Sequence, residues 1–586
     1  MRTCCWQNSI TKFVCLAVFL GWAAPVVVAG IEPDFLMDLD PELQIPQPVE
    51  DFNPAMATLW MAALERPEAD MQRMAAETIA RGHLYGIPDL TKAVPGLERI
   101  LMADSSHPAA RFAAARALIV LESRSSGGKL FEASQAFGAD LQELVEPTLA
   151  VWKIPAAKDV WIERLKTPNI GQRDLLLAIR GLGSVREPSA LDDLLSIASD
   201  MTRNTAVRLA AATAAGNIAE TGLEQPADRL ARNTQAPFFV NQLCAVRLLT
   251  RHSSESARQT LINLASHEEP VVVAAALQRL NEIDFALVLP KAESAMQSVD
   301  PRVRRQGATA MLRRPATSHI GPLSQLLADP HPGLRRDICE GLFQLCEQPE
   351  LDELIRAAAL QVLAGDRWQG QEQAALLLGS LEHPPAADRL VELLESPRAE
   401  ARLASAWALR KVAVKQTIPA LIDRAKRLTE QRSVKGDSPE LDKEVAHLFE
   451  ALGVMHAVDA TPLLLEYVPR RRGWRLSRGA AIWAIGNLNE GTRDSELEER
   501  LSSRILDFEQ QPSEDSLVKQ MSAIALGRMQ AVDQAPMMRQ LAVSDAVDMR
   551  LELSLGWAVR ELTGEELPPP DPSTVGQGNW FLEPLP

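Results

Sequence analysis

The sequence predicts an all-α fold, a right-handed superhelix built from stacked pairs of helices. A short motif with a central arginine returns along the chain, and consecutive copies between Arg173 and Arg402 lie 31 to 36 residues apart. A second apolar stretch, often opened by proline or alanine, follows each copy. The chain is 46% apolar but only 5% aromatic, which is typical of Ala- and Leu-rich helix packing. One helix, a turn and a second helix in roughly 32 residues indicate a helical solenoid.

The clearest copy of the motif is "VDPRVRRQGATAML", residues 299–312. Asp300 can accept hydrogen bonds from the first turn of a helix, and Pro301 fits its first position. Small and apolar residues then recur at helical spacing on one face. They are Val303, Gly307, Ala310 and Met311. We therefore expect a helix that starts near Pro301 and packs closely against its neighbours.

Other copies align on Arg304 as the reference position. Arginine occupies the matching place in seven further copies: Arg111, Arg173, Arg208, Arg335, Arg402, Arg478 and Arg550. Weaker copies carry another residue there: Asn241, Val273, Gln371, Val445 and Lys519.

The pattern D-P-x-V-R-x-x-A-x-x-A-L resembles HEAT repeats. The segments "AIWAIGNL", "ALGVMHAVDATPLLL" and "ALGRMQAVDQAPMMRQL" are similar to the short HEAT-like repeats of phycobilisome lyases, here of an exported bacterial type. The resemblance covers about residues 67–563 and implies an armadillo-like helical solenoid. It implies no particular activity, because such repeats serve many unrelated functions.

The resemblance also implies a structural role for the recurrent arginine. In such arrays this position pairs with acidic or carbonyl groups of the adjacent repeat, and Asp300 and Asp329 are candidate partners. We expect a ladder made of Arg111, Arg173, Arg208, Arg304, Arg335, Arg402 and Arg550.

The first 29 residues are expected to be an export signal. A weakly basic start precedes an apolar run from Phe13 to Ala29, and small residues at Val27 and Ala29 suit cleavage after Ala29. The alternative is an uncleaved anchor, because the run reaches the lower limit for a membrane span. With the signal cleaved, we expect an exported protein, either periplasmic or secreted. It contacts a membrane only if residues 1–29 are retained.

The remaining chain divides into three parts. We expect an acidic, proline-rich arm at 30–55, a repeat array of about 13–14 helix pairs at 56–563, and a proline-rich tail at 564–586. Insertions in the array are expected near 122–140 and 429–440. In the tail, Trp580, Phe581 and Leu582 are expected to cap the last repeat.

Residue patterns for catalysis or metal binding are missing from the sequence. It contains no G-x-S-x-G, H-E-x-x-H or C-x-x-C-H motif, and its nine histidines form no i, i+3 or i, i+4 pair. Cys244, Cys339 and Cys346 occupy small apolar positions and are interpreted as core residues. The net charge of −16 argues against general nucleic-acid binding. We expect no enzyme activity, no cofactor and no metal.

One basic cluster departs from the repeat, in "PRRRGWRLSRG". Guanidinium groups bind carboxylate or phosphate bidentately, and a helix start near Trp474 adds its dipole. The cluster is therefore a candidate contact for an anionic segment or polymer. The alternative is an internal pairing with the acidic run Glu496–Glu499. The members of the basic cluster are Arg470, Arg471, Arg472, Trp474, Arg475 and Arg478.

Two functions are compatible with these features. The first is a noncatalytic exported scaffold whose concave face binds a protein or an extended polymer. The second is an accessory protein of the lyase type, which holds a chromophore or cofactor while a partner is modified. Absorbance of the purified protein distinguishes them, because a bound tetrapyrrole is coloured.

Overall fold

A computed structural model describes residues 31, 33–46, 55–233, 238–436, 438–470, 474–508, 513–544, 546–570 and 585. These residues form 30 α-helices and no strand, with 75% helix in all. The fold is an all-α superhelical solenoid, as the sequence predicts. The segments expected as export signal and C-terminal cap, residues 1–29 and 580–582, lie outside the described residues.

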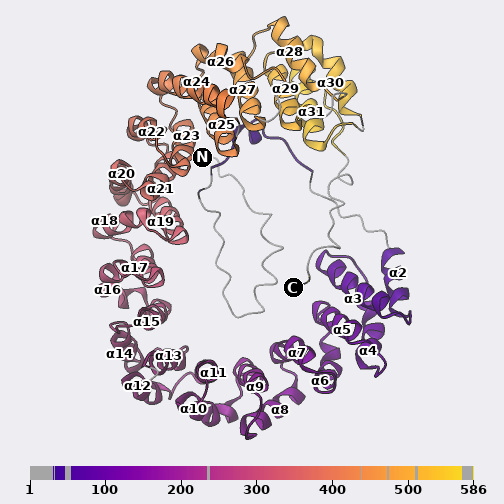
Figure 1. The fold of residues 1–586 in the computed structure, drawn as a ribbon, viewed down its shortest axis with the longest axis vertical. Coiled ribbons are helices and arrows are strands. Elements are labelled where there is room, and N and C mark those ends of the chain that lie inside the picture. Colours follow the sequence, from indigo (N-terminus) through magenta and orange to yellow (C-terminus); the bar gives the residue numbers. More distant parts are fainter. Residues whose placement is uncertain are drawn as a thin grey trace. The chain divides into compact units, whose positions relative to one another are not determined.

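The chain divides into two compact units, and the division falls inside α17 (Pro301–Arg313). Unit 1 holds the described residues from Ala55 to Gly307. Unit 2 holds residues 308–570 together with part of the N-terminal arm. Within each unit, even-numbered helices form an outer layer and odd-numbered helices an inner layer (Figure 1).

Unit 1 alternates regularly between its two layers. The outer helices are α2 (Ala55–Leu64), α4 (Val94–Met102), α6 (Gly127–Ala136), α8 (Pro155–Lys166), α10 (Leu191–Ser199), α12 (Glu224–Arg232), α14 (Glu255–Leu264) and α16 (Leu289–Met296). The inner helices are α3 (Ala69–Leu84), α5 (Pro108–Val120), α7 (Ala139–Trp152), α9 (Gln172–Val185), α11 (Thr205–Ile218), α13 (Phe238–Leu248) and α15 (Pro270–Ile283).

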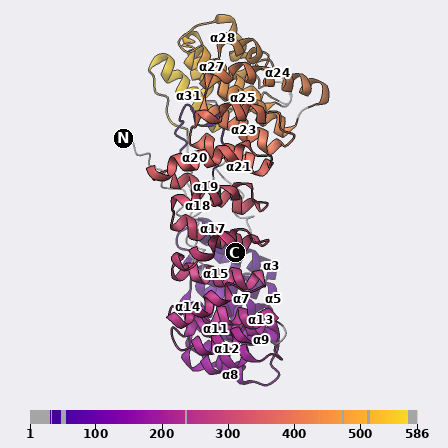
Figure 2. The same cartoon turned by 90° about the vertical axis from the view of Figure 1, so that its left-hand side faces the viewer.

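Unit 2 repeats this arrangement. The outer helices are α18 (Thr317–Gln325), α20 (Pro349–Ala364), α22 (Ala387–Leu393), α24 (Ile418–Lys435), α26 (Thr461–Leu465), α28 (Ser495–Ile505) and α30 (Ala535–Ala542). The inner helices are α19 (Pro332–Leu345), α21 (Trp368–Ser380), α23 (Ala399–Val412), α25 (Pro439–Val454), α27 (Arg475–Leu488), α29 (Ser516–Arg528) and α31 (Met549–Thr563). Figure 2 shows α23, α25 and α27 packed side by side.

Local sequence determines where the helices begin. The carboxylate of Asp300 accepts a hydrogen bond from the backbone N–H of Arg302 at 2.8 Å, one residue after Pro301 opens α17. Asn204 accepts in the same way from Ala206 at 2.8 Å. These caps satisfy N–H groups that have no partner within the helix.

The recurrent arginine is the fourth residue of an inner helix and joins three elements. Arg208 in α11 donates to the carbonyl oxygen of Ala198, near the end of α10, at 3.0 Å, and also to the side chain of Asn241 in the next inner helix. It is 1% exposed. Arg402 in α23 likewise donates to Ser396 O and to Glu444 of α25, both at 2.9 Å. The guanidinium group thus satisfies carbonyls left open at the end of an outer helix and binds the following repeat.

Three further predicted ladder arginines donate to equivalent carbonyl groups. Their acceptors are Leu101 O for Arg111, Ser298 O and Val299 O for Arg304, and Pro330 O for Arg335. Of the acidic partners expected for the ladder, Asp300 pairs instead with Arg302, at 2.7 Å.

The predicted register is wrong at Arg173 and Arg550. Each is the second residue of its helix, where the fourth residues are Leu175 and Glu552. Both arginines are exposed, and Arg173 pairs with its neighbour Asp174 at 3.1 Å. A shift of two residues turns a side chain by about 200° around the helix, away from the preceding outer helix.

The two expected insertions are regular helix. Residues 122–140 contain a short 3-10 turn, Arg124–Ser126, and all of α6, which is an ordinary outer helix. In the second region α24 continues to Lys435 and α25 begins at Pro439. The polar, glycine-containing segment at 122–140 forms the outer helix α6, and the polar segment after Thr429 extends the outer helix α24. Both can be helical because only one face of an outer helix must be apolar.

Removing a ladder arginine should loosen its own repeat pair. We expect Arg208→Ala to lower the local free energy of opening by about 1–3 kcal/mol, because the Ala198 carbonyl and the Asn241 side chain lose their buried donor. Hydrogen exchange should accelerate in α10, α11 and α13 and stay unchanged in distant repeats. Arg173→Ala is the matched control and should change exchange little, since its side chain is 44% exposed. Equal protection in both variants contradicts the ladder.

Candidate functional site

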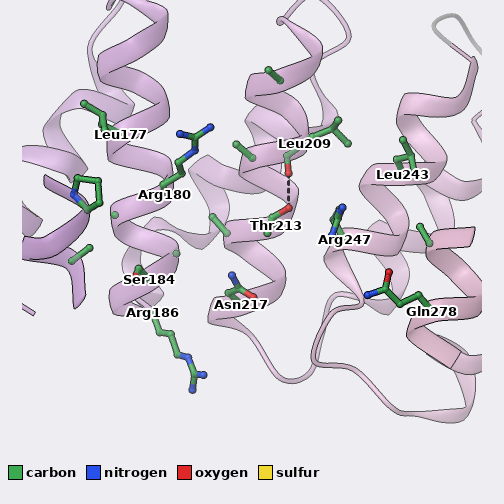
Figure 3. Close-up of a pocket in the computed structure, with 18 of the residues that line it drawn as sticks. Leu177, Arg180, Ser184, Arg186, Leu209, Thr213, Asn217, Leu243, Arg247 and Gln278 are labelled. Atoms are coloured by element: carbon green, nitrogen blue, oxygen red, sulfur yellow. Dashed lines mark hydrogen bonds between the residues drawn. The ribbon is translucent and has the colours of Figure 1, made fainter. Parts of the chain in front are cut away.

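A long hollow of about 1150 Å³ follows the inner helices of unit 1. Its lining comes from α7, α9, α11, α13, α15 and the first turns of α17. Figure 3 shows the central part, where Arg180, Thr213 and Arg247 extend from α9, α11 and α13 in turn. The hollow is therefore an elongated surface shared by successive repeats.

Small residues form the floor of this hollow and bring its helices together. A Cβ atom added to Gly183 of α9 would lie 2.8 Å from the Cα atom of Ala214 in α11. One added to Gly216 of α11 would lie 2.2 Å from the carbonyl oxygen of Arg247 in α13. Larger residues would push these helices apart, so the glycines keep the inner layer closely packed.

The lining is strongly basic although the chain as a whole is acidic. Five arginines line it: Arg180, Arg186, Arg247, Arg302 and Arg305. Glu146 is the one acidic residue among the described lining residues. It is 1% exposed, and its two carboxylate oxygens pair with Arg164 at 2.8 and 2.9 Å. The acidic side chain is thus neutralised internally, and the hollow presents net positive charge.

Three of the arginines are available for an external partner. Arg180, Arg186 and Arg247 are exposed, and their side chains form no ion pair or hydrogen bond within the described part of the chain. Arg302, by contrast, pairs with Asp300 at 2.7 Å. In Figure 3 the side chains of Arg180 and Arg186 extend away from α9 and the turn after it.

Polar groups lie between these charges. Thr213 donates its hydroxyl to Leu209 O at 2.8 Å, so that oxygen keeps acceptor capacity. The side-chain amide of Asn217, one turn further along α11, makes no hydrogen bond to another described residue. An amide offers both donors and an acceptor, which suits the main chain of an extended peptide.

Comparison with known proteins identifies the fold. No protein-family model matches the chain, and no curated protein sequence matches it. Among solved structures, one of Kap95p with RanGDP is 13% identical, with a TM-score of 0.50, and the match covers 87% of this chain and 72% of that one. A structure of importin beta in an ammonium sulfate condition is 14% identical, with a TM-score of 0.50, and the match covers 86% and 72%. The chain has a HEAT-like fold. At this identity the likeness shows the fold alone.

The basic hollow of this HEAT-like array was missed by sequence reasoning. Arg180 is the ninth residue of α9, and the ninth residues of α11 and α15 are Thr213 and Gln278, which also line the hollow. The sequence signal that could have indicated the hollow is an arginine at this ninth position, about one and a half turns after the fourth residue, which is the ladder position. It is weak, because a polar residue on a helix is usually only solvated.

The predicted anion-binding cluster is largely internal. Arg478 is 1% exposed and donates to both oxygens of Glu514, at 2.8 and 2.7 Å. Trp474 is 9% exposed and packs under the guanidinium group of Arg432, whose central carbon lies 4.6 Å from its ring centroid. Buried groups with such partners do not contact another molecule, so the prediction is wrong for Trp474 and Arg478.

The rest of the cluster also has acidic neighbours in unit 2. Arg470 pairs with Asp507 at 3.2 Å, and Arg475 with Asp515 at 3.3 Å. These carboxylates belong to the next repeat and not to Glu496–Glu499, the internal alternative. Arg471 and Arg472 lie outside the described residues.

The three cysteines outside the N-terminal segment are thiols in apolar surroundings. Cys244 and Cys339 are buried and Cys346 is half-buried. Burial raises the pKa of Cys244 to about 11 and that of Cys346 to about 12, and it also raises the pKa of Cys339. These thiols stay protonated at neutral pH and are poor nucleophiles.

No group of three or more His, Cys, Asp or Glu side chains among the described residues is placed to hold a metal ion. No helix among them is both long and apolar enough to cross a membrane.

The Arg478–Glu514 pair makes a testable contribution to acid stability. Burial alone raises the pKa of Glu514, but the hydrogen bonds and charge of Arg478 outweigh it and hold the pKa below the ordinary value of 4.5. This contribution is therefore complete above pH 4.5 and is lost as the pH falls through the lower folded-state value. We expect hydrogen exchange of α27 and α29 to accelerate in that range.

The Glu514→Gln variant should lack this acid-dependent step while opening more readily at neutral pH. Glu496→Gln, which changes an exposed carboxylate, should keep the step. A wild-type profile in the Glu514→Gln variant would show that other groups cause the acid sensitivity.

Proposed function

We propose that the protein is a noncatalytic scaffold whose unit 1 binds an acidic, extended segment of a partner protein in the arginine-lined hollow. The observation that carries this proposal is the set of three exposed arginines, Arg180, Arg186 and Arg247, without ion-pair partners among the described residues. The HEAT-like fold is compatible with it, because a solenoid offers a long concave surface for an extended ligand.

Electrostatics favour an anionic partner. Gathering arginines on one surface costs free energy through mutual repulsion, which a carboxylate-bearing ligand would relieve. Carboxylates accept bidentate hydrogen bonds from guanidinium groups, so a segment rich in Asp or Glu suits the lining. A phosphate-bearing polymer is the competing ligand class. The overall charge of −16 disfavours it more than a short acidic peptide, because a long nucleic acid also meets the acidic surface beyond the hollow.

The dimensions favour an extended chain. Four adjacent inner helices, α9 to α15, at the usual spacing of roughly 8–10 Å cover about 24–30 Å. An extended peptide rises about 3.3 Å per residue, so roughly eight residues cross them. The small floor residues, such as Ala210 and Ala274, let its backbone approach closely.

The test uses a labelled peptide of alternating Glu and Ala, eight residues long, and fluorescence anisotropy at low and at high salt. We expect salt-sensitive binding to the wild-type protein. Replacing Arg180, Arg186 and Arg247 together by Gln should weaken binding by roughly 10- to 100-fold, at about 0.5–1 kcal/mol for each exposed charge pair.

A matched control removes the same charge elsewhere on unit 1. Arg203, Arg229 and Arg232 are exposed and lie on α12 or in the loop after α10. Their triple replacement by Gln should leave binding unchanged. Equal loss in both triple variants indicates a general charge effect, and no loss in the first variant refutes the hollow as the site. A phosphate-bearing oligonucleotide that competes better than the peptide would refute the ligand class.

We further propose that the protein acts after export, as the apolar run from Phe13 to Ala29 indicates. The N-terminus of the protein isolated from its native host should then be Gly30, by mass spectrometry of the exported fraction. A chain that retains residues 1–29 and sediments with membranes would support the anchored alternative, and a chain found with the cytosol would contradict export.

A further inference from the structure

The N-terminal arm lies along the inner layer of unit 2. Residues 34–40 contain one short 3-10 turn, η2 (Leu36–Asp38), and contact inner helices α23, α25, α27 and α29 in order. Figure 1 shows this indigo segment beside α25 and α27. The inner layer of unit 2 thus already holds an extended stretch of protein.

The first anchor is a carboxylate in a basic and aromatic pocket. Asp34 accepts hydrogen bonds from the indole N–H of Trp407, at 2.7 Å, and from Arg410. Partial burial opposes ionisation of Asp34, but these two residues hold its pKa below the ordinary value. Arg410 is 3% exposed and also pairs with buried Glu450 at 3.0 Å. The pocket therefore recognises a charged carboxylate.

The second anchor again combines an indole donor with an arginine, here from two successive inner helices, α27 and α29. The indole N–H of Trp483 donates to the backbone carbonyl of Asp40 at 2.8 Å, and Arg528 donates to its carboxylate at 2.6 Å. Trp407 and Trp483 are both the ninth residue of their helices. Tryptophans at equivalent places in two repeats thus bind two residues of the arm that are six positions apart.

Apolar and main-chain contacts lie between the anchors. The ring of Phe35 stacks on His447 with centroids 4.5 Å apart and an interplanar angle of 8°. Burial lowers the pKa of His447, which keeps the imidazole neutral for this stacking. Met37 is 2% exposed, and its backbone N–H donates to Glu450 at 2.9 Å. Leu39, in contrast, is 54% exposed.

The ladder of unit 2 makes no use of the arm. The pairs Arg402–Glu444 and Arg478–Glu514 join α23 to α25 and α27 to the segment before α29. The two arm carboxylates are 46% and 43% exposed, so water competes for their ion pairs. The ladder pairs are therefore made without the arm, although Met37 of the arm is itself buried and its N–H reaches Glu450.

From these contacts we propose that the inner layer of α23, α25, α27 and α29 is a receptor groove for an extended segment of a partner protein, and that the arm is its intramolecular competitor. The partner segment has two carboxylates six residues apart, an aromatic residue directly after the first, and an apolar residue two positions further on. This groove is separate from the hollow of unit 1 and does not depend on it.

The test is a competition between the arm and the same sequence supplied as a peptide. The probe is a fluorescein-labelled peptide of residues 31–46, IEPDFLMDLDPELQIP, added to the full chain. An arm in place blocks the groove, so wild-type protein should bind weakly. The full-chain variant Asp34→Ala, Phe35→Ala, Asp40→Ala should bind the peptide at least 10-fold more tightly in anisotropy titrations.

Substitutions in the groove establish where the peptide binds. Trp407→Phe and Trp483→Phe, added to the arm variant, remove the indole N–H donors while keeping a large ring. Together they should weaken peptide binding at least 10-fold. Circular dichroism melting of each variant, with ladder residues intact, verifies that the repeats remain folded.

Changes in the peptide establish the recognised pattern. In the peptide, each of the single substitutions Asp34→Asn, Phe35→Leu and Asp40→Asn should weaken binding at least 5-fold. Leu39→Ala is the matched control and should have no effect. One glycine inserted between Leu36 and Met37 sets the carboxylates seven residues apart and should also weaken binding at least 5-fold.

Three outcomes overturn the proposal. Equal affinity of wild type and arm variant shows that the arm does not compete for the groove. Tight binding that survives the Trp407 and Trp483 substitutions places the peptide elsewhere. A wild-type dimer that becomes monomeric in the arm variant, by light scattering, shows that the occupant is the arm of a second copy.

Discussion

The arginine at the fourth position of six inner helices is the contact on which much of the array depends. Each outer helix ends with carbonyl groups that no further turn can satisfy. Arg208, Arg402 and Arg478 donate to such carbonyls in their own repeat and then reach a side chain of the next one, Asn241, Glu444 or Glu514. One side chain therefore closes a repeat and sets its distance from its neighbour. In α9 and α31 the fourth residue is Leu175 or Glu552 instead. In α13 and α21 it is Asn241 or Gln371, and each donates to a carbonyl of the preceding segment.

Because these contacts lie at the helix starts, the middle of each inner helix is left to vary. The ninth residue shows this most clearly: it is Arg180 in α9, Thr213 in α11, and Trp407 and Trp483 in α23 and α27. In unit 1 this position contributes to a basic hollow, and in unit 2 it supplies indole donors to the arm. The same backbone thus carries two surfaces of different chemistry, as expected for a repeat whose stability comes from nearest-neighbour contacts.

Both surfaces are proposed to bind carboxylates, although the chain is acidic overall. Overall negative charge slows encounter with acidic ligands at low salt, so recognition must come from short-range contacts. Arg410 and Arg528 provide these in unit 2, each near a tryptophan that adds an uncharged donor. Under the proposal, charge and hydrogen bonding together distinguish carboxylates at a defined spacing from a merely anionic chain.

The sequence by itself determined the all-α class, the repeat length and the helix starts, because capping and apolar periodicity are local properties of residues such as Asp300, Pro301 and Arg304. It also placed most of the ladder, and it erred at Arg173 and Arg550 because a two-residue shift changes the helical face without changing the motif. Only the tertiary structure decided which charges are internal. Arg478 and Trp474 belong to a conspicuous basic cluster in the sequence, yet they are buried against Glu514 and Arg432. Arg180 and Arg247 look ordinary in the sequence, yet they line an open hollow. The physical reason is that a side chain's partner lies in the next repeat, some 30 to 40 residues away in examples such as Arg208–Asn241 and Arg478–Glu514, where helical periodicity carries no information.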